Sequence, residues 1–267
     1  MVSKAARAGL ERHSIAGIEF DFLEPLQTFS LIAAQPRGNP LLIYLVNPHT
    51  VMVCHRRPDV RNAIQEGDLV LPDGVGIALA SRLLGLPRVA RTPGPDLVLA
   101  LCDAGRAKGF RHFFYGGAPH VAEQMVERLL SEMPDLAVAG CSAPPFFDWE
   151  SDSEEADCRL INDAQADVVW IGLGSPKQEA WAARNRSRIQ ARAIIPVGAA
   201  FDFLSGRKQR APEWIRKLGV EWLYRLLREP KRLWRRNLDS PLFVWEVLKQ
   251  RFGAGAGGQE KAQDRAG

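Results

Sequence analysis

The chain has 267 residues, of which 46% are hydrophobic and 25% charged, as is ordinary for a soluble globular protein of one large or two small domains. Its four cysteines lie far apart and form no CxxC pair, which argues against a zinc site and against a disulfide framework. No apolar run reaches the roughly 18 residues that span a bilayer, and no signal-peptide-like segment follows the basic N-terminus, so a cytoplasmic location is expected.

Positive charge is concentrated in the last fifth of the chain. The segment 207–251 carries thirteen Lys or Arg against five Asp or Glu, a net charge of +8, although the whole chain carries only +4. The remainder is therefore acidic, at −4. A basic block of this kind indicates an acidic partner, which can be phosphate, nucleic acid or anionic lipid.

Strand-like and helical patterns alternate along the chain. The segment 15–33 is expected to hold an edge strand and a short helix. Apolar runs that end at glycine or polar residues predict strands at 41–46, 69–71, 112–115, 167–171 and 193–197, and a weak alternation predicts another at 136–141. Helical patterns lie near 50–66, 75–84, 95–108, 119–132, 151–164 and 177–189. This order predicts an α/β fold with a mainly parallel sheet flanked by helices.

The chain is expected to divide into three parts. Residues 14–206 hold the α/β core, and residues 207–252 form a basic, tryptophan-rich helical appendage. Residues 253–267 are rich in Gly, Ala and Gln, which predicts disorder. Ligands of open α/β sheets bind beyond the carboxyl ends of the strands, so polar strand ends of the core are the first candidates for a site.

The first two strand ends carry an amide and a carboxylate. Asn47 can hydrogen-bond a hydroxylated ligand, although Asn-Pro is also a common turn former. His49 is a candidate acid or base, but a lone histidine is more often structural. Asp73 can act as a general base or can cap the following helix. Gly74 and Gly76 leave the backbone beside it open to a substrate.

Two later segments also suit an anionic or polar ligand. Arg91 can reach a phosphate or be solvated, and Asp96 is expected in the first turn of the next helix. The segment 172–179 reads GLGSPKQE, and its two glycines, Gly172 and Gly174, predict a turn at a helix N-terminus, where N–H groups point outward. Behind that turn, Lys177 can pair with phosphate and Gln178 can read a base or sugar edge.

Arginines in the basic segment recur at helical spacing. Four of them are spaced three, four and three residues apart, which lines one helical face: Arg225, Arg228, Arg232 and Arg235. Pro230 interrupts this pattern and predicts two short helices. Guanidinium groups suit a diphosphate because they donate paired hydrogen bonds and stay charged, although a solvated face is the alternative. The interleaved Trp and Leu suit a membrane interface.

Taken together, these segments resemble the WecG/TagA/CpsF family of bacterial glycosyltransferases. The resemblance covers roughly residues 14–250. It rests on the order and spacing of Asn47, PDGVG (72–76), Arg91 with Gly94 and Asp96, YGG (115–117), GLGSPKQEAW (172–181), VGAAFDFLSG (197–206), RAP (210–212) and Glu221-Trp222 through Arg236.

The resemblance implies a Rossmann-like core with a C-terminal helical appendage. It further implies an inverting, metal-independent enzyme, without a cofactor, that moves a sugar from a UDP-sugar to a polyprenyl-diphosphate-linked saccharide at the inner face of the cell membrane. The sugar expected is N-acetylmannosamine, its uronic acid or glucose, and the product feeds cell-surface polysaccharide synthesis. Peripheral membrane association and no nucleic-acid partner follow. The oligomeric state stays open, and a homo-oligomer is among the alternatives.

The same resemblance implies roles for particular residues. The aspartate of the PDGxG segment, here Asp73, is the expected general base, and Asn47 and Gln178 line the substrate pocket with it. Arg91 is also implicated. Cations of the appendage are expected to meet the diphosphate of the nucleotide or of the lipid: Arg225, Arg232 and Arg235. The chain departs from some members by having Leu45 in place of a threonine, so no role for that hydroxyl carries over.

Two other classes of function remain. A nucleotide-dependent oxidoreductase would use the same type of sheet, but the segment 172–179 lacks the third glycine of the dinucleotide fingerprint. A non-enzymatic nucleic-acid-binding module would use the basic segment, but its Trp and Leu residues and the acidic remainder disfavour this. No Asp-x-Asp and no cluster of His and Cys occurs in the chain, so no metal site is expected.

Overall fold

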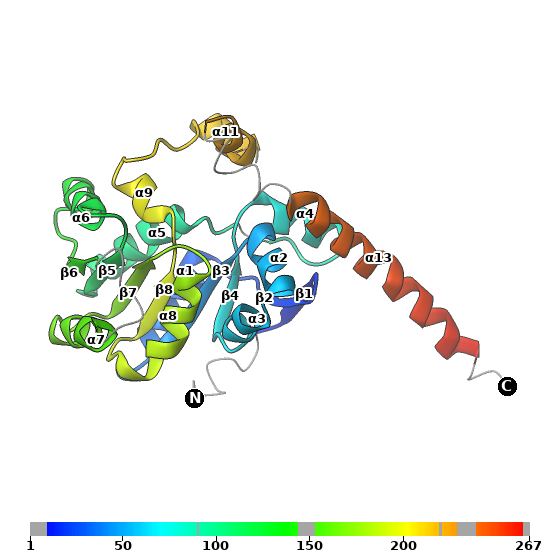
Figure 1. Cartoon of the computed structure of the whole chain (residues 1–267), viewed down its shortest axis with the longest axis horizontal. Coiled ribbons are helices and arrows are strands. Elements are labelled where there is room, and N and C mark those ends of the chain that lie inside the picture. Colours follow the sequence, from blue (N-terminus) through cyan, green and yellow to red (C-terminus); the bar gives the residue numbers. More distant parts are fainter. Residues whose placement is uncertain (1–9, 90, 144–152, 219–220, 229–238, 264–267) are drawn as a thin grey trace.

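The computed structural model describes residues 10–89, 91–143, 153–218, 221–228 and 239–263 (Figure 1). A parallel sheet runs through its centre in the strand order β4-β3-β8-β7-β5-β6. Its six strands are β3 (Leu41–Val46), β4 (Leu69–Pro72), β5 (His112–Gly116), β6 (Val138–Ser142), β7 (Val168–Gly172) and β8 (Ala193–Pro196). The predicted α/β fold with a mainly parallel sheet is confirmed.

Helices cover both faces of this sheet, which is why its inner strands are mostly apolar. One layer contains α2 (Pro48–Arg56), α3 (Pro58–Gln65), α7 (Ser153–Asp163) and α8 (Lys177–Asn185). The other contains α1 (Pro25–Ala34), α5 (Gly94–Arg106), α6 (Val121–Glu132) and α9 (Ala200–Leu204). Along β3, Leu42 and Tyr44 pack into the first layer, whereas Leu41 and Ile43 pack into the second. Each strand therefore contributes alternately to two hydrophobic cores.

The N-terminal strands do not join the main sheet. β1 (Arg12–Ile15) and β2 (Ile18–Asp21) pair antiparallel with each other as a separate hairpin, so the expected edge strand was wrong in its pairing. Ala16 (φ 49°) and Gly17 (φ 77°) form the two-residue turn, whose positive φ angles match the twist of a hairpin. Asp21 holds the hairpin beside β4 by accepting a hydrogen bond of 2.8 Å from the Val70 N–H.

The pattern near 50–66 predicted one helix, but the chain forms two. α2 ends before Arg57, which has an extended backbone (φ −129°, ψ 92°), and α3 begins at Pro58. A residue before proline is disfavoured from the helical region by contact with the proline ring, so the boundary falls at this pair.

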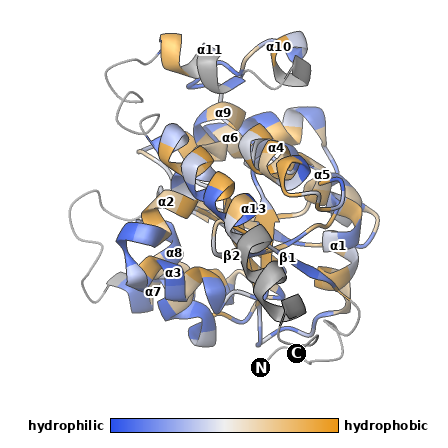
Figure 2. Ribbon diagram, turned by 90° about the vertical axis from the view of Figure 1, so that its right-hand side faces the viewer, coloured by the Kyte–Doolittle hydropathy of each residue, from blue (hydrophilic) through white to orange (hydrophobic). Residues whose placement is uncertain are grey.

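Among the described residues, the helices that follow the core are α10 (Glu213–Leu218), α11 (Glu221–Arg228) and α13 (Asp239–Gln263). Both ribbon views place α11 above α9, and Figure 2 shows α10 beside α11 (Figures 1 and 2). The first half of α13 packs on the core through the buried Phe243 and Val247, and its far end extends away from the body (Figure 1). Gln250 fastens it to the hairpin by accepting from the Ala16 N–H (2.7 Å) and donating to the Ser14 carbonyl (2.8 Å).

The division into core, appendage and tail stays a prediction. The structure continues α13 to Gln263, through residues whose composition predicts disorder. Besides glycine, this stretch contains Ala, Gln, Glu and Lys, which are good helix formers. No helix in the described ranges combines the length and the apolarity needed to cross a bilayer.

Candidate active site

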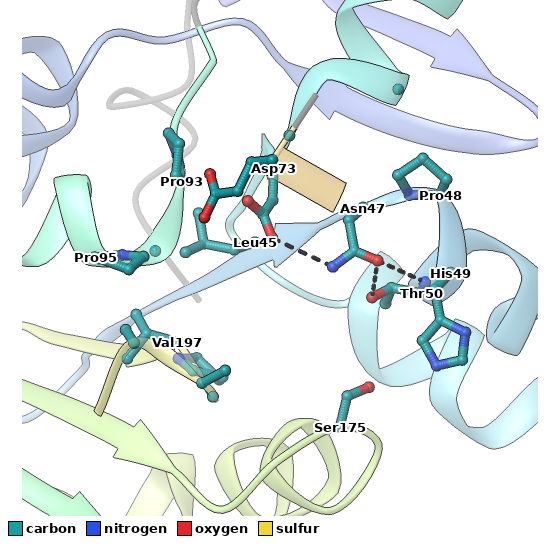
Figure 3. A pocket seen from close by; sticks show the side chains of 18 of the residues that line it. Leu45, Asn47, Pro48, His49, Thr50, Asp73, Pro93, Pro95, Ser175 and Val197 are labelled. Atoms are coloured by element: carbon teal, nitrogen blue, oxygen red, sulfur yellow. Dashed lines mark hydrogen bonds between the residues drawn. The ribbon is translucent and has the colours of Figure 1, made fainter. Parts of the chain in front are cut away.

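A cavity of about 1140 Å³ lies at the carboxyl ends of β3, β4, β7 and β8 (Figure 3). The chain leaves β3 toward α2 in one helical layer and leaves β8 toward α9 in the other, so the neighbouring strand ends diverge. Such a change of direction opens a crevice in α/β sheets. The cavity exceeds the roughly 300–1,000 Å³ of a typical small-molecule pocket, and it has room for more than one ligand group.

Asn47 holds two neighbouring strand ends together. Its Oδ1 caps α2 by accepting hydrogen bonds from the Thr50 backbone N–H (3.1 Å) and the Thr50 hydroxyl (3.2 Å). Its Nδ2 donates to Oδ2 of Asp73 at 3.2 Å, as the dashed lines in Figure 3 show. Both ends of the amide are engaged, so its orientation is fixed and it orients the carboxylate. Asn47 therefore combines the turn-forming role expected of Asn-Pro with a contact inside the cavity.

Asp73 does not cap the helix that follows it. α4 (Val75–Leu83) has Gly74 as its N-cap, and that cap makes no side-chain hydrogen bond. Gly74 has φ 87°, a conformation that glycine adopts without steric cost. The first N–H groups of α4 lack partners within the helix and carry partial positive charge, which favours a carboxylate beside them. Gly74 therefore occupies the N-cap position that the structural alternative gave to Asp73, and Asp73 lines the cavity.

Gly76 permits the close approach of α2 and α4. A Cβ at this position would lie 2.4 Å from Cγ of Pro48, so any side chain would push the two helix starts apart. Asn47 and Asp73 lie directly before the starts of these two helices. The distance between the helix starts therefore also limits the distance between the amide and the carboxylate. Gly76 lines the cavity as expected, and the structure adds a packing reason for the glycine.

Gln178 connects the segments that follow β7 and β8. Its Oε1 accepts from the Gly174 N–H (3.2 Å), and its Nε2 donates to Oε1 of Glu179 (3.2 Å). A Cβ on Gly198 would come within 3.1 Å of the same Oε1. Glu179 is only 3% exposed and lines the cavity, and the sequence had assigned it no role. A carboxylate in the first turn of α8, next to a glycine turn, was the available signal.

The remaining predicted contacts in the core also border the cavity. Gly172, Gly174 and Lys177 line it, and so does Arg91. Lys177 and Arg91 are exposed, so an anion that enters the cavity from solvent can reach both cations. Asp96 lies in the first turn of α5, as predicted, and receives a hydrogen bond of 2.7 Å from Arg210, a further cavity residue.

Residues of the C-terminal segment line the cavity, but the structure does not describe the side chains of the three arginines expected to bind diphosphate. Glu213 of α10 and Glu221 of α11 line the cavity. The backbone of Arg225 belongs to α11, but the position of its side chain is not described, and Arg232 and Arg235 lie outside the described residues. Their expected contact with a diphosphate stays a prediction.

His49 joins the cavity rim to the start of α13. Its Nδ1 lies 2.5 Å from Oδ2 of Asp239, and Arg56 donates to both oxygens of that carboxylate at 2.6 and 3.0 Å. Burial opposes ionisation of Asp239, but the hydrogen bonds from Arg56 and His49 outweigh it and lower its pKa. The pairing therefore stabilises the fold above the ordinary carboxyl pKa and is lost as the pH falls through the lowered value. These contacts favour a structural role for His49.

A family model described as "Glycosyl transferase WecG/TagA/CpsF family" matches residues 13–257. The chain belongs to this family. Among the relatives of this WecG/TagA/CpsF member is the N-acetylglucosaminyldiphosphoundecaprenol N-acetyl-beta-D-mannosaminyltransferase of Bacillus spizizenii, 35% identical over 78% of each chain. The protein of the same name from Staphylococcus aureus is 26% identical over 91% of this chain and 94% of its own. The predicted family is confirmed, and with it a glycosyltransferase rather than an oxidoreductase or a nucleic-acid-binding module.

Leu45, the position at which the sequence departs from some members of the family, lies at the cavity. It lines the wall between Asn47 and Gly94, and its Cδ1 would lie 3.5 Å from a Cβ at Gly94. The side chain at this position of the cavity wall is therefore apolar and offers no hydroxyl. Among the described residues, no three His, Cys, Asp or Glu are grouped so that they could hold a metal ion.

Replacement of Asn47 by Asp separates its two functions. Asn47→Asp keeps an oxygen that can cap α2, but it places a second negative charge next to Asp73. Two adjacent carboxylates resist ionising together, so the acid limb of the pH–activity profile is expected to move to higher pH. Asn47→Ala is expected to lower the free energy of unfolding by about 1 kcal/mol through loss of the cap. Its acid limb should not move to higher pH. An unchanged acid limb in Asn47→Asp would contradict a working contact between residues 47 and 73.

Proposed function

We propose that this glycosyltransferase moves an N-acetylmannosamine-type sugar from a UDP-sugar to a polyprenyl-diphosphate-linked saccharide, with inversion and without a metal ion. One observation carries the proposal: Asp73 is held by Asn47 in a large cavity at the carboxyl ends of the strands. The names of the relatives, which act on N-acetylglucosaminyldiphosphoundecaprenol, support the class of acceptor and the sugar.

The proposed reaction is a single displacement. The acceptor hydroxyl transfers its proton to the Asp73 carboxylate as its oxygen forms a bond to the anomeric carbon. The bond between that carbon and the UDP oxygen breaks on the opposite side, which inverts the configuration. The electron pair passes to the departing diphosphate.

Cations of the chain can stabilise that leaving group. Arg91 and Lys177 both line the cavity and are exposed to it. Their positive charge, together with the N-terminal N–H groups of α4 and α8, favours negative charge developing on the diphosphate. We propose that the arginines of the appendage, Arg225, Arg232 and Arg235, add to this effect, which would make a metal ion unnecessary.

We further propose peripheral association with the inner face of the cell membrane, where a polyprenyl-linked acceptor would reside. Large apolar side chains are exposed on helices after the core: Trp214 (63% exposed) on α10, Leu227 (74%) on α11 and Trp245 (58%) on α13. Apolar residues are visible on α11 and along α13 in Figure 2. In a basic segment, such side chains suit insertion into an anionic interface.

A donor screen tests this function. Purified protein is incubated with an N-acetylglucosaminyl-diphospho-prenol and a panel of UDP-sugars, with and without a chelator, and UDP release and product mass are measured. We expect transfer from UDP-N-acetylmannosamine, undiminished by the chelator. Transfer from another UDP-sugar would correct the donor, and loss of activity with the chelator would overturn metal independence. Absence of transfer from every donor would reject the reaction itself.

A further inference from the structure

An apolar strip leads away from the catalytic end of the cavity along α4. Val75, Leu79 and Leu83 follow one another at four-residue intervals, so they share one face of this helix. All three line the cavity, and the strip begins two residues after Asp73. Over eight residues the helix rises about 12 Å, which is the length of a short run of isoprene units rather than of a whole polyprenyl chain.

α13 supplies the facing wall. Phe243, Val244 and Val247 lie on one side of α13 and line the same cavity as the α4 strip. Phe243 and Val247 are only 3% and 1% exposed, whereas Val244 is 51% exposed and Leu79 is 56% exposed. The buried side chains form the floor of a groove, and the exposed ones form its two edges. None of the six residues carries a charge.

The groove is held at both ends. At its inner end, Asp239 at the start of α13 is tied to α2 by Arg56 and His49. At its outer end, Arg251 of α13 donates a hydrogen bond to the carbonyl of Leu83, the last residue of α4. The Arg251 contact joins α13 directly to α4, and the Asp239 contacts join α13 to α2, so polar contacts outside the groove hold α13 in place along it.

We infer that the groove of Val75, Leu79, Leu83, Phe243, Val244 and Val247 binds the first isoprene units of the acceptor. The inference rests on the proposed function, since it takes a polyprenyl-linked acceptor as its occupant. It is carried by continuity: the groove and the Asp73 site are parts of one cavity, which is larger than one polar ligand needs. A sugar nucleotide offers no apolar group for such a surface, whereas a prenyl tail attached to the acceptor diphosphate does.

The test varies the tail of the acceptor without any membrane. N-acetylglucosaminyl diphosphates with tails of one, two and three isoprene units are used as monomeric acceptors, and KM is measured for each. The wild type is expected to gain affinity as the tail lengthens, because each added unit buries more apolar surface. In Leu79→Gln and Val244→Thr, which change exposed residues and should fold, KM for the three-unit acceptor is expected to rise about tenfold, and less for the shorter tails.

Leu242→Gln is the matched control. Leu242 is 49% exposed on the same helix but does not line the cavity, so its variant should follow the wild type across the whole series. Equal losses at every tail length in Leu79→Gln, or no loss at all, would overturn the groove. So would an effect of these variants that arises only when vesicles are added, because it would locate the residues at the membrane surface.

A binding measurement separates this inference from the proposed reaction. Calorimetry with geranyl and farnesyl diphosphate needs no donor and no turnover. Tighter binding of the longer compound by the wild type, lost in Leu79→Gln, would support the groove even if no UDP-sugar were transferred. Equal binding of farnesyl diphosphate by the wild type and Leu79→Gln would reject the groove, whatever the donor screen shows.

Discussion

Asp73→Asn is expected to lower kcat by a factor of about 10² to 10⁴, the usual contribution of a general base. An amide cannot take up the proton of the acceptor hydroxyl, although it keeps the shape of the side chain. Its oxygen can still accept the hydrogen bond from Nδ2 of Asn47, so the junction of β3 and β4 should remain intact. Initial rates at saturating donor and acceptor, measured across pH, are the appropriate observation.

Two controls make the result interpretable. The thermal unfolding midpoint of Asp73→Asn should stay within a few degrees of the wild type, which would exclude a folding defect as the cause. The KM for the donor should change much less than kcat, because the base acts in the transition state rather than in binding. The acid limb of the wild-type pH profile should also vanish. A variant with near-normal kcat would require another base and would remove the proposed mechanism.

Gly116→Ala is expected to destabilise the fold by about 4 kcal/mol. Gly116 ends β5 with φ 117°, where a side chain is strained, and its Cβ would lie 2.8 Å from the carbonyl carbon of Gly172. The obstacle is backbone in the neighbouring strand, paired in register with Gly116, so it cannot rotate away. A fall of roughly 10 °C in the unfolding midpoint is expected.

Gly109→Ala provides the comparison. Gly109 has φ 62°, but nothing lies within 4 Å of a Cβ there, so only the conformational strain of about 1 kcal/mol should appear. Similar midpoints for the two variants would show that the contact with Gly172 does not constrain the sheet. A larger loss of stability in Gly116→Ala would show that the ends of β5 and β7 are in close backbone contact. The segment 172–179 begins at this end of β7.

Local pattern was enough to predict much of the core. Continuous apolar runs bounded by polar turns predicted the buried strands, because a strand buried on both faces needs an apolar side chain at nearly every position. The half-buried edge strand β6 was predicted from a weak alternation instead. The strand expected within 15–33 was predicted as an edge strand, whereas it pairs in a separate N-terminal hairpin. Its residues have a strand pattern, but that pattern does not specify which backbone will satisfy the hydrogen bonds of the strand.

The sequence also predicted the candidate residues at the strand ends. Asn47 and Asp73 each follow an apolar run, and in a parallel sheet both runs end at the same edge. The sequence could not predict the hydrogen bond between them. That bond depends on β3 and β4 being direct neighbours and on the close packing of Pro48 against Gly76. The two roles of Asn47 and the packing role of Gly76 emerged only from that contact.

Periodicity and turn chemistry are local properties, so the chain alone established the α/β class, the carboxyl-end candidates and the basic C-terminal segment. The tertiary structure decided which strands are adjacent, that Gln178 links the segments after β7 and β8, and that Asp239 fastens α13 to α2. The groove joins side chains about 160 positions apart, Leu83 on α4 and Phe243 on α13. Contacts at such separations depend on how whole elements pack, and no short stretch of residues records that packing.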